Sequence, residues 1–389
     1  MRLSILTGGK DPHYALGLLG ALLSKPIQID FIGNNEMEKS EIIKSKNVKY
    51  LNLRGDQNPN ANIIRKGFRV IKYYIKLINY ALHSQTKLFH ILWLNKFFYF
   101  DSIILTQFYK CLSKKLIYTA HNINIRERDG GNSWLYQKSL SFMYHKMDHI
   151  FVHTNKMKDE LIKKFGIEDK KISVIPFGIN EIIPQININR NEARKRLGLN
   201  NREKIILFFG NIAPYKGLEY LLEGFNLLYR KGRNYKLFIV GRVKNCTNYF
   251  NKLLKFIKDN DLKDKVELKI EYIPDEEVEI YFKSADVLVL PYRIIFQSGV
   301  LFLSYNFGLP VIATDVGALR EEIIERKTGF ICRPGDPKDI ADKIDFYFES
   351  DLYRNLEENR IKIIEYAKEK YSWSKVAEKT YQIYKKLME

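Results

Sequence analysis

The sequence is poor in cysteine and histidine, which bears on disulfide and metal chemistry. Its 389 residues include three cysteines, Cys111, Cys246 and Cys332, which lie far apart. This spacing fits neither a disulfide framework nor a zinc site. The seven histidines form no metal-ligand cluster along the chain either. We therefore expect no disulfide framework, no bound metal and no cofactor.

Long apolar runs are also missing. No stretch reaches the roughly 18 residues that a membrane-spanning helix needs. The nearest candidate, Leu88–Tyr109, is interrupted by Asn95, Lys96 and Asp101. The first residues, MRLSILTGGKD, show no basic segment followed by a long apolar one, so the sequence predicts no signal peptide. We expect a cytoplasmic protein.

Acidic residues are scarce in the first half of the chain. Residues 1–180 carry 28 Lys and Arg against 14 Asp and Glu, which is +14 of the net charge of +19. This imbalance indicates an anionic partner, such as a membrane surface, a phosphorylated lipid or nucleic acid. No recognisable nucleic-acid module accompanies the charge, so we do not expect nucleic acid. A bias of the whole sequence toward Lys, Ile and Asn is the alternative cause.

The sequence does contain an alternation of short apolar segments with amphipathic ones, which is typical of parallel α/β sheets. The alternation occurs twice, on either side of a polar linker at Asn180–Asn191. We therefore expect two α/β domains, residues 1–180 and 181–371. The expected strands are Leu3–Leu6, Gln28–Ile32, His90–Leu94, Lys115–Thr119, His149–His153 and Ile172–Ile175, then Lys204–Phe209, Lys236–Val240, Val266–Ile270, Val287–Leu290, Pro310–Ala313 and Gly329–Ile331.

One helix in the first half, Asn62–His83, combines an apolar face with a basic one. Its apolar positions are Ile64, Phe68, Ile71, Ile75, Ile78 and Leu82, and its basic positions are Arg65, Arg69, Lys72 and Lys76. The spacing predicts a helix packed on its sheet with a solvated basic face. The alternative is contact of this helix with anionic headgroups or an acceptor.

Two segments of the second half carry residue types that bind phosphate. In Gly210–Gly217 a buried strand ends at a glycine turn, and Lys216 stands just before the next helix. Such turns lie at the carboxyl end of parallel strands, where open α/β sheets bind ligands. In Gln297–Gly308, Ser298 is the expected helix N-cap, and the amides after it would face an anion.

With several shorter motifs, these segments resemble glycosyltransferase family 4. The resemblance spans nearly the whole chain and is closer in the second half. It rests on Gly210–Gly217, Val240–Arg242, Tyr272–Asp275, Ser284–Val287, Gly308–Ile312 and Thr328–Phe330, and on Thr7–Gly9, Thr119–Asn122, Phe151–Thr154, Ile175–Ile179 and Trp373. It implies a GT-B fold, in which two Rossmann-like domains face each other across a cleft and the last helix, residues 372–389, crosses back to the N-terminal domain. It also implies sugar transfer from a nucleoside diphosphate sugar, with retention of configuration and without a metal.

The resemblance also assigns roles to single residues. Lys216 matches the lysine that binds the donor diphosphate, and Gly9 matches a loop near the sugar and phosphate. His121 matches a histidine near the donor sugar, so we expect His121 and Lys216 to be catalytic. The donor is further expected to contact Gly210, Asn211, Gly241, Arg242, Tyr272, Ile273, Arg293, Gln297, Ser298, Gly299 and Val300.

Two departures from the family concern the donor. Ile295 and Leu303 stand where the family often has a pair of glutamates that contact the sugar and ribose. The chain resembles a branch of the family that has Gln-Ser-Gly at this helix in place of the glutamate motif. That contact would pass to Gln297, Ser298 or backbone amides.

The second departure removes a positive charge from the diphosphate site. Asn211 stands where the family tends to have an arginine, and Arg293 or Arg242 would supply the missing charge. Both are close in sequence to the expected donor motifs.

Other function classes remain open at this point. A GT-B nucleotide-sugar epimerase would need acid and base groups, and the sequence offers few suitable carboxylates. A weak or inactive sugar-nucleotide-binding partner at the membrane would fit the missing glutamates and the basic helix. A dinucleotide oxidoreductase is disfavoured because no Gly-x-Gly-x-x-Gly turn follows a strand. The favoured function is transfer to a glycan or lipid-linked acceptor in surface polysaccharide biosynthesis, in the cytoplasm or peripherally on the inner face of the cell membrane.

Overall fold

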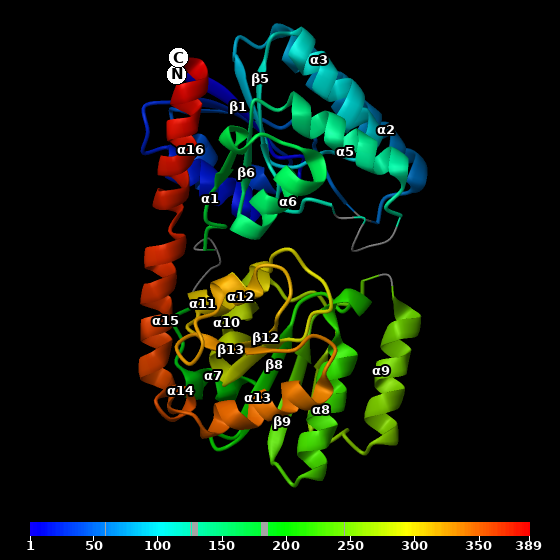
Figure 1. The fold of residues 1–389 in the computed structure, drawn as a ribbon, viewed down its shortest axis with the longest axis vertical. Coiled ribbons are helices and arrows are strands. Elements are labelled where there is room, and N and C mark those ends of the chain that lie inside the picture. The colour runs from blue at the N-terminus through cyan, green and yellow to red at the C-terminus, as the bar shows by residue number, and fades with distance from the viewer. Residues whose placement is uncertain (59, 125, 127–130, 180–185, 245) are drawn as a thin grey trace. The chain divides into compact units, whose positions relative to one another are not determined.

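The chain folds into two compact units (Figure 1). The computed structural model describes all 389 residues except 59, 125, 127–130, 180–185 and 245, so part of the expected linker Asn180–Asn191 lies outside the described residues. Unit 1 comprises Met1–Gly178 and Tyr371–Glu389, and unit 2 comprises Ile179–Lys370. Both units are α/β, and each is built on one parallel sheet with the Rossmann-like arrangement that we expected.

Unit 1 is built on a seven-stranded parallel sheet with the order β3-β2-β1-β4-β5-β6-β7. Its strands are nearly continuous apolar runs because helices cover both faces of such a sheet. The strands are β1 (Arg2–Leu6), β2 (Gln28–Ile32), β3 (Val48–Leu51), β4 (Leu88–Ile91), β5 (Lys115–Thr119), β6 (His149–Val152) and β7 (Ile172–Val174). The main helices are α1 (Pro12–Leu22), α2 (Ile63–His83), α3 (Thr106–Cys111), α5 (Trp134–Lys146), α6 (Asn155–Phe165) and α16 (Trp373–Met388).

Unit 2 has a six-stranded parallel sheet with the order β10-β9-β8-β11-β12-β13. From β8 the next strands, β9 and β10, are added on one side of the sheet, and β11 to β13 are then added on the other side. Ligands of open α/β sheets bind where the strand order reverses in this way. The strands are β8 (Lys204–Phe209), β9 (Tyr235–Val240), β10 (Val266–Lys269), β11 (Val287–Leu290), β12 (Val311–Thr314) and β13 (Gly329–Cys332). The helices are α7 (Arg190–Arg196), α8 (Leu218–Arg230), α9 (Thr247–Asp259), α10 (Asp275–Ser284), α11 (Gly299–Asn306), α12 (Leu319–Glu322), α13 (Pro337–Glu349), α14 (Asp351–Arg354) and α15 (Leu356–Tyr371).

All twelve strands expected from the sequence are present, with ends that differ by at most a few residues. The structure adds β3, which the apolar pattern missed. This four-residue strand lies at the edge of the sheet, and none of its residues is fully buried. A short edge strand needs no apolar run, so its sequence carries little signal.

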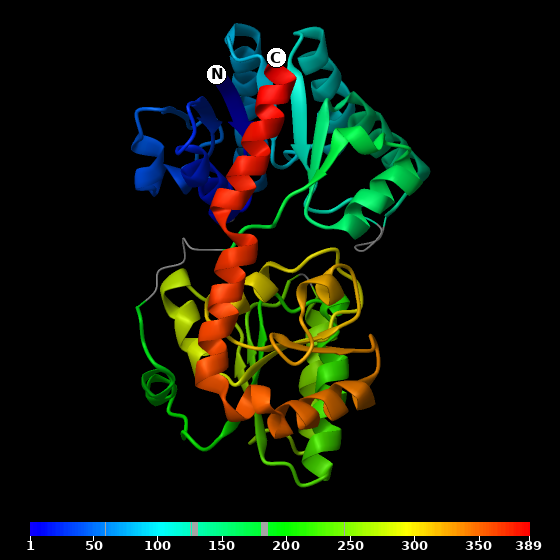
Figure 2. The ribbon, with the colours of Figure 1, turned by 60° about the vertical axis from the view of Figure 1, so that its left-hand side comes forward.

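The end of the chain completes unit 1, because α16 packs along α1 (Figure 2). The indole of Trp373 lies against two glycines: a Cβ at Gly17 would be 2.3 Å from it, and one at Gly178 would be 2.6 Å away. Further along α16, the buried Tyr384 hydroxyl hydrogen-bonds His90 Nδ1 over 2.5 Å. These contacts confirm that the last helix returns to the N-terminal domain.

Candidate functional site

The loops after β8 and β9 turn at two glycines that lie against each other. Gly210 has φ 106°, and its N–H donates to the Val240 carbonyl over 2.9 Å. Gly241 has φ 140°, and a Cβ built there would lie 2.0 Å from the Gly210 carbonyl oxygen. Only glycine fits this close approach. The two turns are therefore held together by backbone packing at the carboxyl end of the sheet.

Lys216 is a buried cation that has no carboxylate partner in the part of the chain that the structure describes. It ends the 3₁₀ turn Pro214–Lys216 (η5), and Gly217 with φ 63° leads into α8. Lys216 is only 6% exposed, and its Nζ donates to the Tyr292 hydroxyl over 3.1 Å. A buried ammonium with one neutral partner has lost its hydration and favours an anion beside it.

The start of α11 presents backbone donors near this lysine. Ser298 occupies the N-cap position, as expected, but its hydroxyl does not cap the helix and instead hydrogen-bonds Tyr292 over 3.2 Å. The amides of Gly299 and Val300 have no acceptor among the described residues. The positive end of the helix dipole adds to these donors. Tyr292 thus joins Lys216 to the helix start, a role that the sequence analysis missed although Tyr292 directly follows a buried strand and a proline.

Gln297 has a side-chain amide that is buried and unsatisfied. Neither its Oε1 nor its Nε2 has a hydrogen-bond partner among the described residues. Buried polar atoms are nearly always paired in folded proteins, so an amide with two unpaired ends points to a ligand. The expectation that Gln297 contacts the donor stays a prediction, and this geometry supports it.

Ile295 and Leu303, which replace the family's glutamates, belong to the protein core. Each is 9% exposed. The Ile295 carbonyl packs against Gly317, where a Cβ would lie only 2.0 Å from the oxygen. An ionised carboxylate at either position would be buried at high cost. If the chain binds a donor sugar, as we expect, other residues must contact it.

Arg242 lies beside Asn211, the residue that stands where the family tends to have an arginine. Its Nε donates to Asn211 Oδ1 over 3.2 Å, and its guanidinium lies 5.7 Å from the centre of the Tyr272 ring. Tyr272 is 63% exposed beside the buried Ile273, which suits a ring that stacks on a base.

Arg293 is oriented differently from Arg242. Its guanidinium Nη1 lies 3.8 Å from a Glu219 carboxylate oxygen. Its backbone N–H donates to the Tyr215 carbonyl over 2.9 Å. Arg293 is thus partly neutralised, and Arg242 is the better source of the missing charge.

In unit 1, His121 lies in an aromatic cluster just beyond β5. Its ring stacks on Trp93 at 4.3 Å between centres and meets the edge of Tyr14 at 4.5 Å. Burial, and then the neighbouring His153, holds the pKa of His121 well below its usual range, so the ring is neutral at pH 7. His121 Nε2 is buried and has no partner among the described residues.

His153 sets the tautomer of His121. His153 Nδ1 lies 3.3 Å from the Ile175 carbonyl oxygen, and its Nε2 lies 3.0 Å from His121 Nδ1. The carbonyl can only accept, so the neutral His153 carries its proton on Nδ1 and accepts at Nε2. His121 then donates from Nδ1, and its Nε2 is a free acceptor. The sequence analysis missed His153, although β5 and β6 are adjacent and both histidines follow their carboxyl ends.

Gly9 lies in a tight turn after β1 that Arg54 covers. Gly8 and Gly9 have φ 60° and 65°, and a Cβ at Gly9 would lie 2.3 Å from Arg54 Cδ. Substitution at Gly9 would therefore displace the arginine side chain. The structure gathers Gly9, Arg54 and His121 within unit 1 and the other expected donor residues within unit 2.

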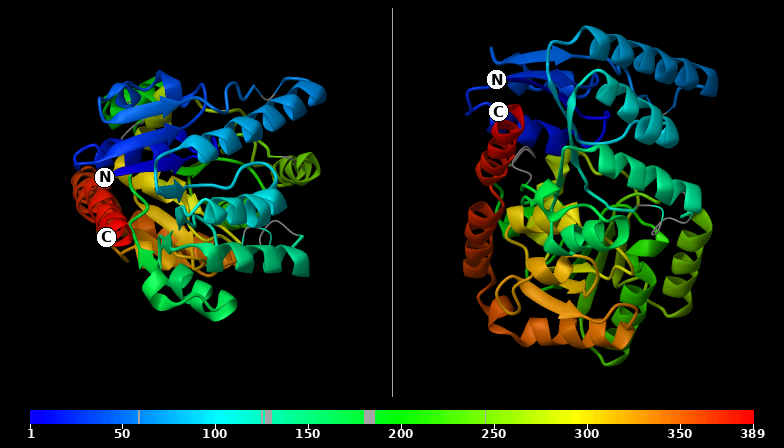
Figure 3. Two further views of the ribbon diagram at one scale, coloured as in Figure 1. Left: turned by 90° about the horizontal axis from the view of Figure 1, so that it is seen from above. Right: turned by 45° about the horizontal axis from the view of Figure 1, so that its top comes forward.

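The expected packing of α2 on its sheet through the apolar stripe is wrong. Ile64, Phe68 and Ile75 are 84%, 67% and 63% exposed. Ile63, Ile71 and Leu82 are also exposed, so this apolar face does not pack on the sheet. The ribbon of α2 lies on the outside of unit 1 (Figure 3). The opposite face, with Tyr73 and Tyr74, is buried instead.

Hydrogen bonding explains this choice of face. The Tyr80 hydroxyl donates to Asp30 over 2.8 Å, and the Tyr74 hydroxyl donates to Asp101 over 2.9 Å. Isoleucines could not provide these bonds, which add to the bonds that Asp30 accepts from Arg2 and that Asp101 accepts from Asn95. Of the basic residues expected on α2, Arg65, Lys72 and Lys76 are exposed, whereas Arg69 pairs with Asp56 at 2.8 Å. Within the described residues no helix is long and apolar enough to cross a membrane.

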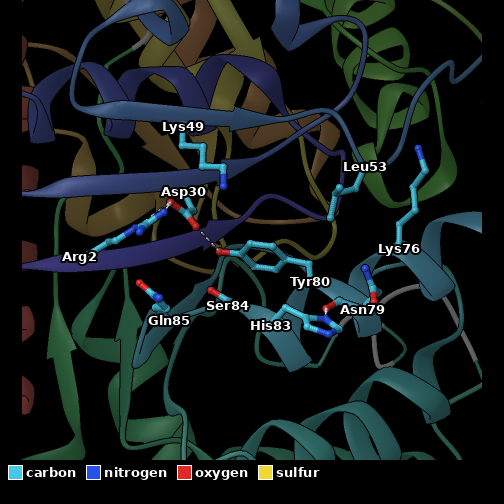
Figure 4. Close-up of a pocket in the computed structure, with 10 residues that line it drawn as sticks. All are labelled: Arg2, Asp30, Lys49, Leu53, Lys76, Asn79, Tyr80, His83, Ser84 and Gln85. Atoms are coloured by element: carbon cyan, nitrogen blue, oxygen red, sulfur yellow. Dashed lines mark hydrogen bonds and ion pairs between the residues drawn. The ribbon is translucent and has the colours of Figure 1, made fainter.

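A hollow of about 630 Å³ lies between α2 and the strands β1, β2 and β3 of unit 1. Figure 4 shows Arg2 and Tyr80 converging on Asp30, with Lys49, Lys76 and His83 around them. Arg2 pairs with Asp30 at 2.9 Å, so its charge is already compensated. Neither Gly9 nor His121 lines this hollow.

Two family models match the chain. The model described as glycosyl transferases group 1 matches residues 189–370, and the model described as glycosyltransferase family 4 matches residues 46–181. An uncharacterised glycosyltransferase of Methanocaldococcus jannaschii is 30% identical over 237 residues, which are 60% of this chain and 58% of that protein. Mannosylfructose-phosphate synthase of Agrobacterium fabrum is 27% identical over 51% of this chain and 44% of its own length. The matches thus span about half the length of these relatives.

Solved structures resemble the chain over its whole length. Sucrose-phosphate synthase from Thermosynechococcus elongatus has a TM-score of 0.78 at 18% identity and covers 100% of this chain and 98% of its own. Anabaena HepE, solved in complex with UDP, has a TM-score of 0.75 at 14% identity and covers 99% and 100%. At these identities the likeness establishes the fold.

Proposed function

Because this chain belongs to the glycosyl transferases of group 1 and family 4, we propose that it moves a sugar from a nucleoside diphosphate sugar to a glycan or lipid-linked acceptor. The observation that carries the proposal is the buried, unpaired ammonium of Lys216 beside the free amides at the start of α11. This arrangement suits a diphosphate. Unit 2 would hold the donor, and unit 1 would hold the acceptor.

The diphosphate is the leaving group, and its developing charge must be neutralised. Lys216 and the amides of Gly299 and Val300 supply donors for it, and Arg242 adds a second cation. With these groups in place we propose that no metal takes part. Tyr272 and Ile273 would enclose the nucleotide base. The UDP in the HepE structure supports a nucleoside diphosphate as the ligand type.

The transferred sugar would contact Gln297 in unit 2, through an amide that can both donate and accept. His121 would accept a hydrogen bond from a sugar hydroxyl at Nε2. In the proposed retaining step, the bond from the anomeric carbon to the diphosphate oxygen breaks. The acceptor oxygen bonds to that carbon on the same face, and its proton passes to the departing phosphate oxygen.

A lipid-linked acceptor would bring the protein to a membrane. Helix α2 exposes an apolar face with Phe68 and Ile75, flanked by Arg65, Lys72 and Lys76. Apolar side chains beside basic ones are typical of helices that lie on anionic lipid surfaces. We therefore propose peripheral contact with the inner face of the cell membrane, in surface polysaccharide biosynthesis.

A thermal-shift screen of nucleotide sugars tests the donor assignment, since a ligand that binds only the native state raises the melting temperature. At least one nucleoside diphosphate sugar should stabilise the chain. NMR of the anomeric proton in the transfer product should then show the same anomeric configuration as in the donor. A cooperative melt that no nucleotide sugar shifts would contradict the donor proposal, and an inverted product would contradict retention.

A further inference from the structure

A second hollow in unit 1, of about 240 Å³, has a lining rich in positive charge. Its cationic residues are Arg54, Lys66, Arg69 and Lys96, and the lining contains no carboxylate. Arg69 is neutralised by Asp56 at 2.8 Å. The other three form no ion pair within the described ranges of the chain. A concave surface with unpaired cations concentrates anions.

Lys10 adds to the same concentration of charge. Its pKa is lowered mainly by burial and then by the nearby charges of Arg54 and Lys96. Asp101 acts in the opposite direction, and it is the one carboxylate among the neighbours that shift this pKa. The positive charges of this cluster thus remain largely uncompensated by the protein itself.

Arg54 is held in a fixed position with one donor unused. Its Nε donates to Gln57 Oε1 over 3.2 Å, and its guanidinium lies 5.0 Å from the centre of the Tyr73 ring. Tyr73 is itself fixed by its hydroxyl, which donates to Asn95 over 2.6 Å. Arg54 Nη1 is buried and has no partner among the described residues. A preoriented guanidinium with a free N–H is suited to a phosphate oxygen.

The position of Arg54 relates this hollow to the glycine turn after β1. The arginine side chain crosses Gly9 so closely that a Cβ there would lie 2.3 Å from Arg54 Cδ. Lys66, Arg69 and Tyr73 come from α2, the helix with the exposed apolar face. We propose that the hollow binds a phosphate or pyrophosphate group of the acceptor, next to the hydroxyl that is glycosylated. This assignment rests on the proposed function, because it takes the anion to be part of the acceptor.

The test measures the binding of inorganic pyrophosphate to the full chain by calorimetry. Lys216→Ala is introduced first, so that pyrophosphate does not report the proposed donor site. This variant should still bind one equivalent. Adding Arg54→Gln or Lys96→Gln should weaken the binding at least tenfold, whereas Lys39→Gln, an exposed lysine outside the hollow, should leave it unchanged. Lys96 is exposed, so its replacement tests the site without disturbing the core.

Two outcomes would overturn the anion site: loss of all pyrophosphate binding in Lys216→Ala alone, or equal binding with and without Arg54 and Lys96. Neither outcome touches the donor proposal, which fails separately if no nucleotide sugar stabilises the wild type. Methyl phosphate and dodecyl phosphate, the latter below its micelle concentration, distinguish the source of the phosphate. A lipid source predicts at least tenfold tighter binding of dodecyl phosphate, and loss of that difference in Phe68→Ser. Equal binding of the two assigns the site to a water-soluble phosphate.

Discussion

His121 Nδ1 donates to His153 Nε2 over 3.0 Å, and this one hydrogen bond decides which nitrogen of His121 is available to a ligand. The Ile175 carbonyl fixes the proton of His153, and His153 fixes the proton of His121. His121 Nε2 is left as an acceptor within the aromatic cluster. His153 is therefore a positioning residue in the proposed reaction, although it need not touch the substrate.

Replacement of His153 should separate this role from packing. Glutamine can place an acceptor near the position of Nε2, whereas asparagine is too short. His153→Asn should lower kcat about tenfold, the effect of about 1.4 kcal/mol from a lost buried hydrogen bond. His153→Gln should restore most of it. Steady-state kinetics of both variants, with melting curves as control, check the prediction, and equal losses in the two would argue against the tautomer role.

Lys216 should matter far more for turnover than for stability. Lys216→Ala removes the cation from the diphosphate, and the loss of one such donor lowers kcat about a hundredfold or more. Lys231→Ala, at the far end of α8 and 54% exposed, is the matched control and should be silent. Initial rates at saturating donor test this. Near-normal turnover in Lys216→Ala would refute the donor assignment.

Gln297 should affect recognition of the sugar and leave binding of the nucleotide alone unchanged. In Gln297→Ala the nucleotide sugar should bind about tenfold more weakly, because roughly 1.4 kcal/mol of hydrogen bonding is lost. The corresponding nucleoside diphosphate, which has no sugar, should bind as in the wild type. Calorimetric titration of both ligands measures the difference. A parallel loss for both would move Gln297 to the phosphate site.

The exposed face of α2 should control attachment to anionic vesicles. Phe68→Ser combined with Ile75→Ser removes apolar contact, and Lys72→Glu combined with Lys76→Glu reverses charge worth about 1 kcal/mol per basic residue. Both pairs should reduce co-sedimentation with phosphatidylserine vesicles, and neither should lower the melting temperature, because the side chains are exposed. Leu227→Ser with Leu254→Ser, two exposed leucines of unit 2, is the control. Unchanged co-sedimentation of both α2 variants would show that this face does not bind anionic vesicles.

Unit 1 should lose stability as the pH falls from 6.5 toward 4. Burial lowers the pKa of His90 to about 3 and the pKa values of His149 and His153 to about 4. In this window the unfolded chain binds more protons than the folded one, so each histidine destabilises by up to about 1.4 kcal/mol per pH unit. Burial raises the pKa of Asp101 to about 6, so this one group stabilises the fold as the pH falls and opposes the three histidines.

Tryptophan fluorescence can follow this unfolding selectively. All three tryptophans, Trp93, Trp134 and Trp373, belong to unit 1. Urea unfolding monitored by their emission should give a lower midpoint at pH 5 than at pH 7.5, and His90→Gln should reduce the difference. A midpoint that does not change between these two pH values would show that the buried histidines do not control stability.

Several features of the proposed donor site were predictable because they are local in sequence. Gly210 and Lys216 belong to one strand–turn–helix unit, and Ser298 with the two following amides forms one helix start. The position of Tyr292 between Lys216 and Ser298 was not predictable, because it depends on β8 and β11 being neighbours in the sheet. The same holds for His153, which meets His121 only through the pairing of β5 with β6.

The sequence by itself determined the two α/β units, nearly all the strands and the turns proposed to bind phosphate, since apolar runs and glycine turns depend on residues next to one another. Only the tertiary structure decided which face of α2 is buried. Both faces have helical spacing, and the tyrosine face packs on the sheet because its hydroxyls satisfy Asp30 and Asp101. Tertiary structure also decided that the Arg54 side chain lies across Gly9 and that its Nη1 has no hydrogen-bond partner among the described residues. Contacts between distant residues follow from packing and from the need to pair buried polar groups, and neither is written in the local pattern.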